Sequence, residues 1–138
     1  SIQAQIINLL KHLQDQLGLS YLFISHDLNV VAYLCSEVAV MYRGQIVEYA
    51  PTDELFDNPN HPYTNILLSA APDSEIGQQP ITITTEDDLP EYLNQPAACR
   101  FAHKCYLHQP RCDQSQEAFH TVGENHYVRC WKTTERSL

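Results

Sequence analysis

The sequence lacks a long apolar run and carries little positive charge. No stretch of its 138 residues comes near the roughly 18 consecutive apolar residues that a membrane-spanning helix needs. Its net charge of −9 argues against a general nucleic-acid-binding protein, which presents a basic face. Its first residues show no basic start followed by an apolar stretch and a cleavage site. We therefore expect no membrane span, no nucleic-acid partner and no secretory signal.

Lysine, arginine and proline are missing from whole sections of the chain. No Lys or Arg occurs between Gly44 and Cys99, where ten acidic residues stand, whereas six of the eight basic residues lie from Arg100 to Arg136. All eight prolines lie at or after Pro51. This change of composition near residue 50 predicts a boundary. The chain does not begin with Met and its first residues already have a helical period, so we treat it as a fragment that starts inside a domain.

In the first part of the chain, the spacing of apolar residues indicates helices and a strand in alternation. Apolar residues at helical spacing predict a helix over residues 2–17, which a glycine ends. The short apolar run at residues 21–25 predicts a strand that is buried on both faces. A second helical stripe predicts a helix over residues 28–35, capped by Asp27 or Ser25.

A hairpin and two short helices are predicted next. The predicted elements are strands at 37–42, 45–50 and 81–84 and helices at 51–58 and 61–70. Thr52 is the predicted N-cap of the first of these helices. From Cys99 onward periodicity is weak, so we expect side-chain chemistry to hold that part together. The fold class is thus predicted as α/β, in the order helix–strand–helix–hairpin, followed by a small irregular Cys-rich C-terminal region.

A histidine follows the predicted strand at 21–25. His26 stands where a buried strand gives way to a helix, and open α/β sheets bind ligands beyond the carboxyl ends of their strands. A histidine there can donate a hydrogen bond to a phosphate or orient a water, while a histidine that only caps or packs is the alternative. Ser25, His26 and Asp27 do not form a catalytic triad, because neighbours along a chain point in divergent directions.

Four cysteines in the C-terminal part are candidate metal ligands. They are spaced C-x5-C-x6-C-x17-C and are Cys99, Cys105, Cys112 and Cys130. Four thiolates fit a tetrahedral zinc site or an iron–sulfur cluster, although the CxxC pairs of zinc ribbons are absent. Two disulfides, or free packed thiols, are the alternatives. Each cysteine has a basic residue within two positions, which would offset the charge of the thiolates.

Other cysteine and histidine side chains rank lower as ligands. Cys35 lies on the apolar stripe of the predicted helix at 28–35, so we expect an unreactive buried thiol. His103 and His108 lie among the cysteines and could replace one of them as a ligand. For His61, which precedes a proline, we expect a structural role.

Four segments in combination resemble one family. SIQAQI matches the helix after the D-loop of ABC-transporter ATPases, ISHDL their switch-histidine segment, and MYRGQIVEYAP the hairpin that closes their nucleotide-binding domain. NPNHPYTNILLSA matches the HPY segment that marks the peptide-importer branch. The chain therefore resembles the C-terminal part of an ATP-binding subunit of the oligopeptide/dipeptide/nickel importer group.

The resemblance implies a division of the chain and roles for its residues. Residues 1–50 would end the P-loop nucleotide-binding domain, residues 51–72 would be a helical connector with the HPY segment, and residues 73–138 would be the transporter C-terminal region. His26 would be the switch histidine that contacts the γ-phosphate of ATP, with Mg²⁺ bound in the complete subunit. The cysteine motif carries a [4Fe–4S] cluster in some members, and zinc is the alternative.

The segments that would hold a nucleotide are missing from the chain. It has no GxxxxGK[ST], no LSGGQ-type signature and no apolar run ending in Asp-Glu, so we predict that alone it neither binds ATP tightly nor hydrolyses it. The resemblance implies a complete subunit at the cytoplasmic face of the membrane, powering import of peptides or related solutes. Its partners would be a second ATP-binding subunit, two permease subunits and, indirectly, an extracytoplasmic solute-binding protein. A non-catalytic, metal-stapled regulatory or interaction module is the alternative.

Overall fold

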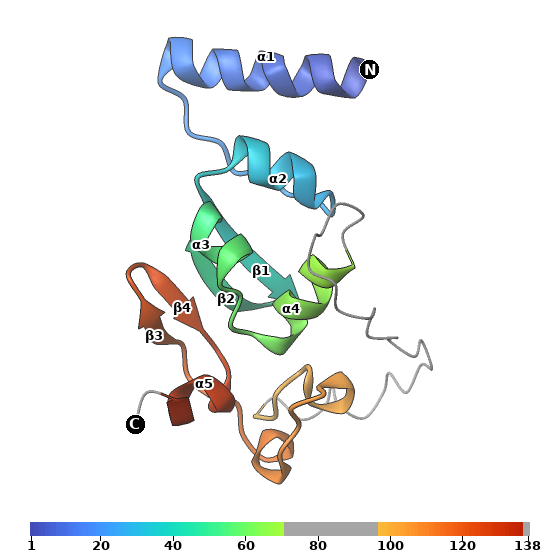
Figure 1. Cartoon of the computed structure of the whole chain (residues 1–138), viewed down its shortest axis with the longest axis vertical. Coiled ribbons are helices and arrows are strands. Elements are labelled where there is room, and N and C mark those ends of the chain that lie inside the picture. The colour runs from blue at the N-terminus through green and yellow to red at the C-terminus, as the bar shows by residue number, and fades with distance from the viewer. Residues whose placement is uncertain (71–96, 137–138) are drawn as a thin grey trace. The chain divides into compact units, whose positions relative to one another are not determined.

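A computed structural model describes residues 1–70 and 97–136, with side chains to residue 133 (Figure 1). The chain divides into two compact units, Ser1–Ser36 (unit 1) and Glu37–Leu138 (unit 2), which are described separately. The predicted strand at 81–84 lies outside the described residues.

Unit 1 contains two helices, both of them predicted. Helix α1 spans Ile2–Leu17, with the Ser1 hydroxyl accepting a hydrogen bond from the Ala4 N–H at 3.2 Å. It ends at Gly18, whose φ of 63° is the left-handed conformation that glycine adopts without a steric penalty. Helix α2 spans Leu28–Leu34 and is capped by Asp27, one of the two predicted caps.

The prediction of a strand at residues 21–25 is wrong. These residues form no ladder hydrogen bonds, and Leu22 and Ile24 are 94% and 90% exposed. A buried parallel strand needs neighbouring strands to pair its N–H and C=O groups and to cover both faces. No strand in the described part of unit 1 offers such pairing, so the segment stays extended and unpaired. The observed order in unit 1 is therefore helix, extended segment, helix.

A four-stranded antiparallel sheet organises unit 2, in the order β1-β2-β4-β3. Its strands are β1 (Glu37–Tyr42), β2 (Gln45–Pro51), β3 (His120–Gly123) and β4 (His126–Val128). The predicted β1–β2 hairpin is confirmed. Its turn has positive φ at both central residues, 45° at Arg43 and 77° at Gly44, as a two-residue turn matching the twist of a hairpin requires.

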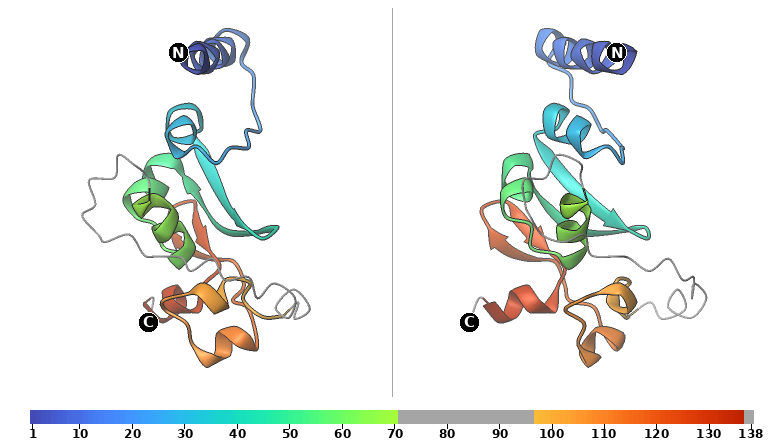
Figure 2. Two further views of the ribbon diagram at one scale, coloured as in Figure 1. Left: turned by 90° about the vertical axis from the view of Figure 1, so that its right-hand side faces the viewer. Right: turned by 45° about the vertical axis from the view of Figure 1, so that its right-hand side comes forward.

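Two short helices follow β2. Helix α3 spans Thr52–Asp57 and helix α4 spans Pro62–Ser69, close to their predicted ranges. The prediction of Thr52 as an N-cap is wrong, because the cap is Pro51, which offers no side-chain acceptor, and Thr52 is already helical. Figure 2 shows α3 and α4 on one side of the β1–β2 hairpin, where they close the core. That core consists of Val40, Val47, Ala50 and Leu55, edged by Val38, Tyr42, Phe56, Tyr63 and Leu67.

The C-terminal region is less irregular than predicted. Two 3₁₀ helices, η2 (Ala102–Lys104) and η3 (Pro110–Asp113), are the only helices described between residues 97 and 119. The chain then forms β3 and β4, which extend the sheet of the first hairpin, and helix α5 (Trp131–Arg136). The Cys-rich region therefore belongs to the same compact unit as the β1–β2 hairpin.

Candidate functional site

His26 lies on a short turn whose neighbours are both engaged in hydrogen bonds. The Ser25 hydroxyl accepts from the Asp27 N–H at 2.9 Å. The Asp27 carboxylate accepts from the N–H groups of Asn29 at 3.0 Å and Val30 at 3.3 Å. Between these two caps the His26 side chain is exposed. The structure thus presents an accessible imidazole on a turn that hydrogen bonds hold on both sides. Ser25 and Asp27 bind backbone N–H groups nearby and do not form a triad with His26.

An open groove of about 370 Å³ also lies in unit 1. Its lining is mainly apolar, with Gln3 and Ser25 the polar members; the other lining residues are Ile2, Ile6, Ile7, Leu10, Phe23 and Val30. A phosphate site needs converging N–H donors or basic side chains. This groove has the composition of a packing surface instead.

All four candidate cysteine ligands line one small cavity in unit 2, which we call the four-thiol cavity. Its volume is about 20 Å³, enough for roughly one water molecule. The peptide N–H of Cys99 donates to the Cys112 carbonyl at 2.9 Å and holds two of the four cysteines side by side. Phe101, Ala102, Leu107 and Trp131 supply apolar parts of the wall.

Three of the four thiols of this cavity, those of Cys99, Cys105 and Cys130, are held neutral. Burial raises the pKa of Cys99 and of Cys130, and it raises the pKa of Cys105 to about 11. Neighbouring cysteines add to the effect because two thiolates would repel each other. The thiolate is the form that ligates metals and attacks electrophiles. The cavity therefore has the donor atoms of a metal site, but at least three of them lack the charge that a ligand needs.

The fit to a metal centre is partial. The donor set is suitable, since four sulfurs share one cavity wall. Yet among the residues that the structure describes, no three His, Cys, Asp or Glu side chains are arranged to hold a metal ion. The geometry therefore gives no support to iron–sulfur or zinc beyond the donor set itself.

The basic neighbours of the cysteines have different positions. Arg129 and Lys132 line the four-thiol cavity. Arg111 lies over the Trp131 ring, 4.7 Å from its centre, and the Arg100 guanidinium donates to the Arg43 carbonyl at the β1–β2 turn.

The remaining histidine and cysteine candidates have local roles. His108 lies 2.8 Å from the Asp113 carboxylate at the surface. Burial, followed by the positive charges of Arg43 and Lys104, lowers the pKa of His103. Cys35 is half-buried at the end of α2, and burial raises its pKa, as expected for an unreactive thiol.

His61 connects the HPY segment to the four-thiol cavity. It is the N-cap of α4: its Nδ1 accepts a hydrogen bond from the Tyr63 N–H at 3.1 Å. Its side chain is 1% exposed, and burial lowers its pKa to about 4, so the ring is neutral. The ring also lines the cavity and lies 5.9 Å from the Phe101 ring. His61 thus has the structural role expected of it.

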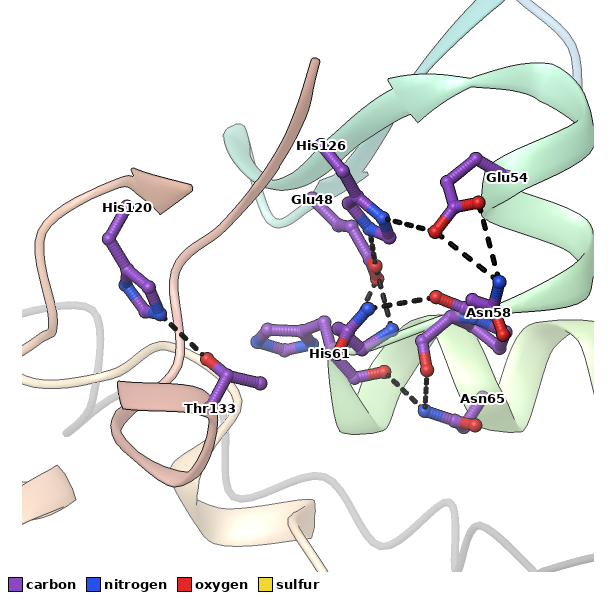
Figure 3. Close-up of polar contacts among 10 residues, drawn as sticks. Glu48, Glu54, Asn58, His61, Asn65, His120, His126 and Thr133 are labelled. Atoms are coloured by element: carbon purple, nitrogen blue, oxygen red, sulfur yellow. Dashed lines mark hydrogen bonds and ion pairs between the residues drawn. The ribbon is translucent and has the colours of Figure 1, made fainter. Parts of the chain in front are cut away.

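A buried polar cluster centred on Glu48 was not predicted (Figure 3). Glu48 on β2 is fully buried and accepts from the N–H groups of Asn60 at 2.7 Å and His61 at 2.9 Å. His126 on β4 is 1% exposed, and its Nε2 lies 2.7 Å from Glu48 Oε1. The other ring nitrogen lies 3.4 Å from the carboxylate of Glu54 on α3. We call these residues the Glu48 cluster.

The sequence held one signal for this cluster. Glu48 is an acid in an otherwise apolar strand, and no Lys or Arg occurs between Gly44 and Cys99 to pair with it. A buried carboxylate must be paired or hydrogen-bonded. Its partners therefore had to be backbone N–H groups, a histidine or a basic residue from a distant part of the chain.

The sequence of the chain is similar to that of known transport proteins. Residues 47–112 match the model of the oligopeptide/dipeptide transporter C-terminal region. The chain is 40% identical over 131 residues to the dipeptide transport ATP-binding protein DppF of Haemophilus influenzae, an alignment covering 95% of the chain and 40% of that protein. It is 41% identical over 134 residues to the oligopeptide transport ATP-binding protein AppF of Bacillus subtilis, covering 94% and 40%.

A third relative gives the same result. The chain is 44% identical over 123 residues to DppF of Escherichia coli, covering 89% of the chain and 37% of that protein. The chain thus spans about 40% of the length of the curated relatives it matches. None of the helices in its described part combines the length and hydropathy needed to cross a bilayer. Over most of its length the chain is similar to the C-terminal region of oligopeptide and dipeptide ABC-transporter ATP-binding proteins.

Proposed function

We propose that this chain is part of the ATP-binding subunit that powers ABC-type import of peptides, or of related solutes, by ATP binding and hydrolysis. The observation that carries the proposal is the 40% identity over 95% of the chain to a dipeptide transport ATP-binding protein. The complete subunit works at the cytoplasmic face of the membrane, paired with a second ATP-binding subunit and joined to two permease subunits. A solute-binding protein outside delivers the cargo.

In this proposal His26 acts on the terminal phosphate. Phosphoryl transfer needs placed donors and charge stabilisation more than covalent chemistry. The imidazole donates a hydrogen bond to a γ-phosphate oxygen and helps to position the attacking water. The hydrogen bonds that hold its turn and the exposure of its side chain support this role for His26. A donor that is already in place needs little rearrangement of the protein when the phosphate binds. ATP and Mg²⁺, when bound by the complete subunit, supply the phosphoryl group and offset its charge.

The exposed apolar surface of unit 1 supports its place in a larger domain. Leu22 and Ile24 in the unpaired segment are almost fully exposed. Four apolar residues of α1 are exposed as well: Ile2, Ile6, Leu9 and Leu17. Exposed apolar clusters of this kind mark surfaces that another element covers. We assign residues 1–50 to the end of the nucleotide-binding domain, residues 51–72 to the connector and residues 73–138 to the C-terminal region of the complete subunit.

A metal held by Cys99, Cys105, Cys112 and Cys130 is a second proposal, supported by their shared cavity. The metal would staple a region with few buried apolar residues. The family resemblance implies a [4Fe–4S] cluster. A cavity of about 20 Å³ accommodates a single ion with less rearrangement than a cluster, so zinc is the alternative. Metal analysis separates the two: iron with acid-labile sulfide, or zinc alone. Such a site could also serve a non-catalytic regulatory module.

The ATPase proposal is tested on a complete subunit that carries this chain. We expect His26→Ala to lower the ATPase rate by about 10²–10³-fold, the usual effect of removing one electrostatic donor. The matched control is His12→Ala, which removes another exposed histidine of unit 1 and leaves the rate within about twofold. Residues 1–138 alone should show no turnover. Full activity in the His26 variant contradicts the role of His26, and turnover by the chain alone contradicts the proposed division of labour.

A further inference from the structure

The four-thiol cavity is lined by segments that lie far apart in the sequence. At the start of α4, His61 and Pro62 form one part of its wall. At the end of β4, Arg129 and Cys130 form another. Local structure cannot bring two such segments together, so a contact between distant residues must hold them at one cavity. Glu48, on the central strand β2, makes contacts to both.

Glu48 holds the start of α4 through its backbone (Figure 3). The carboxylate accepts from the Asn60 N–H at 2.7 Å and from the His61 N–H at 2.9 Å. Within the part of the chain that the structure describes, these are the only hydrogen bonds that join Asn60 or His61 to residues outside the stretch 58–65. Pro62, the next residue, has no N–H to donate. The position of this wall relative to β2 is therefore set in large part by Glu48.

Glu48 also holds the end of β4. The sheet register pairs Glu48 with Val128, so His126, two residues earlier, lies diagonally across from Glu48 on the same face. At that spacing His126 Nε2 lies 2.7 Å from Glu48 Oε1, and both side chains are buried. The Arg129 N–H adds a backbone hydrogen bond to the Val47 carbonyl at 2.9 Å. The second wall of the cavity follows directly and is thus held against β2 as well.

We infer that Glu48 is a clamp that keeps the four-thiol cavity closed by holding the start of α4 and the end of β4 on one strand. A buried carboxylate must replace its hydrogen bonds to water, and here both segments supply the donors. Oε1 alone faces the Asn60 N–H and His126 Nε2, so loss of one donor weakens the site for the other. The clamp controls how readily reagents reach the thiols. It depends neither on the proposed ATPase role nor on a bound metal.

The test measures alkylation of each cysteine by iodoacetamide, read by mass spectrometry, in the full chain after chelator treatment and without denaturant. Glu48→Gln keeps the size of the side chain but turns one acceptor oxygen into an NH₂ group. In either orientation of the amide this group faces a peptide N–H, because Oε1 accepts from Asn60 and Oε2 from His61. We expect the cavity thiols to react about tenfold faster, the effect of one lost buried hydrogen bond. Cys35 of unit 1 should keep its rate and is the internal reference.

Two control variants separate the clamp from general destabilisation. Glu54→Gln makes the same chemical change at an acid that is 40% exposed and lies 3.4 Å from His126, so alkylation should change less than about twofold. Val40→Ala shortens a core side chain that does not line the cavity. It should lower the urea midpoint without speeding alkylation in the absence of denaturant.

Variants of His126 test the β4 side of the clamp and decide the matter if Glu48→Gln does not fold. His126→Phe keeps a ring but loses the donor, so Cys130, which follows β4, should gain about tenfold in rate, more than the other cavity thiols. His126→Gln places an amide N–H near the former Nε2 and should retain most of the protection. The clamp is refuted if Glu48→Gln reacts no faster than Val40→Ala, or if Cys130 is equally protected in His126→Phe and His126→Gln.

Discussion

The Glu48 cluster and the four-thiol cavity lie in the same unit and share one residue, yet they are built in opposite ways. His61 gives its backbone N–H to Glu48 and its ring to the cavity wall. Around Glu48, each described contact brings a charged or polar group to a partner at hydrogen-bonding distance. In the cavity, burial keeps three of the four thiols neutral within a largely apolar wall. The protein alone completes the first site, whereas the second gains its charge and ligand geometry only if a metal binds.

The largest effect is expected from removing the centre of the Glu48 cluster. Glu48→Ala removes the acceptor of the Asn60 and His61 N–H groups and the partner of His126 Nε2. His61 and His126 are buried, and Asn60 is half-buried. Breaking a buried pair in this way costs about 3–5 kcal/mol. Urea unfolding of the full chain, with its midpoint and slope both measured, provides the test.

The matched control for that variant is Glu54→Ala. The Glu54 side chain is 40% exposed and its contact to His126 is longer, so it should cost less than about 1 kcal/mol. Equal losses in the two variants would contradict the view that Glu48 is the centre of the cluster.

His61, which the two sites share, should make the stability of the fold sensitive to acid. Burial lowers its pKa to about 4, against about 6.5 when unfolded, so the unfolded chain binds more protons between these values. Stability is then fully present above about pH 6.5 and falls as the pH drops toward 4, by roughly 3 kcal/mol in total. Denaturant midpoints measured across this range check the sign.

His61→Asn provides the comparison for that acid dependence. Asparagine is a good N-cap and can accept from the Tyr63 N–H, but it does not titrate. We expect the variant to lose some packing against Phe101 at all pH values while its acid dependence flattens. If the loss of stability in acid is unchanged in this variant, a group other than His61 causes it.

Cys112→Ser separates a metal-bound cavity from a merely packed one. If four sulfurs hold a metal, the variant releases it, and amide exchange should increase across residues 99–131 while residues before 50 change little. In a metal-free chain, replacing this one thiol should cost no more than about 1–2 kcal/mol. Metal content and exchange are measured on the same samples. A metal that stays bound in full amount shows that the four-cysteine assignment is wrong.

The elements that were predicted correctly have local signals. The period of α1 and the glycine after it, the two-residue turn at Arg43 and Gly44, and the proline that opens α4 each act within one turn of chain. The segment at 21–25 failed because burial on both faces comes from neighbouring strands, which an apolar run alone does not provide. Strands β3 and β4 escaped prediction because they are only four and three residues long and carry polar side chains.

The two sites of unit 2 differ in the same respect. Repetition of one rare residue type indicated the four-thiol cavity, and all four cysteines do line it. The Glu48 cluster depends on the register of β2 with β4, which brings residues 78 positions apart together. The sequence showed that Glu48 needed a partner, but long-range strand pairing decides that the partner is His126.

The smallest expected effect concerns the rim of the four-thiol cavity. The Arg111 guanidinium lies over the Trp131 ring, 4.7 Å from its centre, and its Nε donates to the Gln109 side chain at 2.8 Å. Arg111→Lys keeps the charge but loses the planar stacking and the directed donor, at a cost of about 0.5–1 kcal/mol. Arg43→Lys is the matched control, because the Arg43 guanidinium lies over the Tyr42 ring, 5.6 Å from its centre, and Arg43 does not line the cavity. If the indole seals the cavity, only Arg111→Lys should speed alkylation of the thiols in a denaturant-free assay, because a loosened Trp131 admits reagent to buried sulfur. Equal rates in both variants would mean that the backbone around η2 and η3, rather than this stack, keeps the cavity closed.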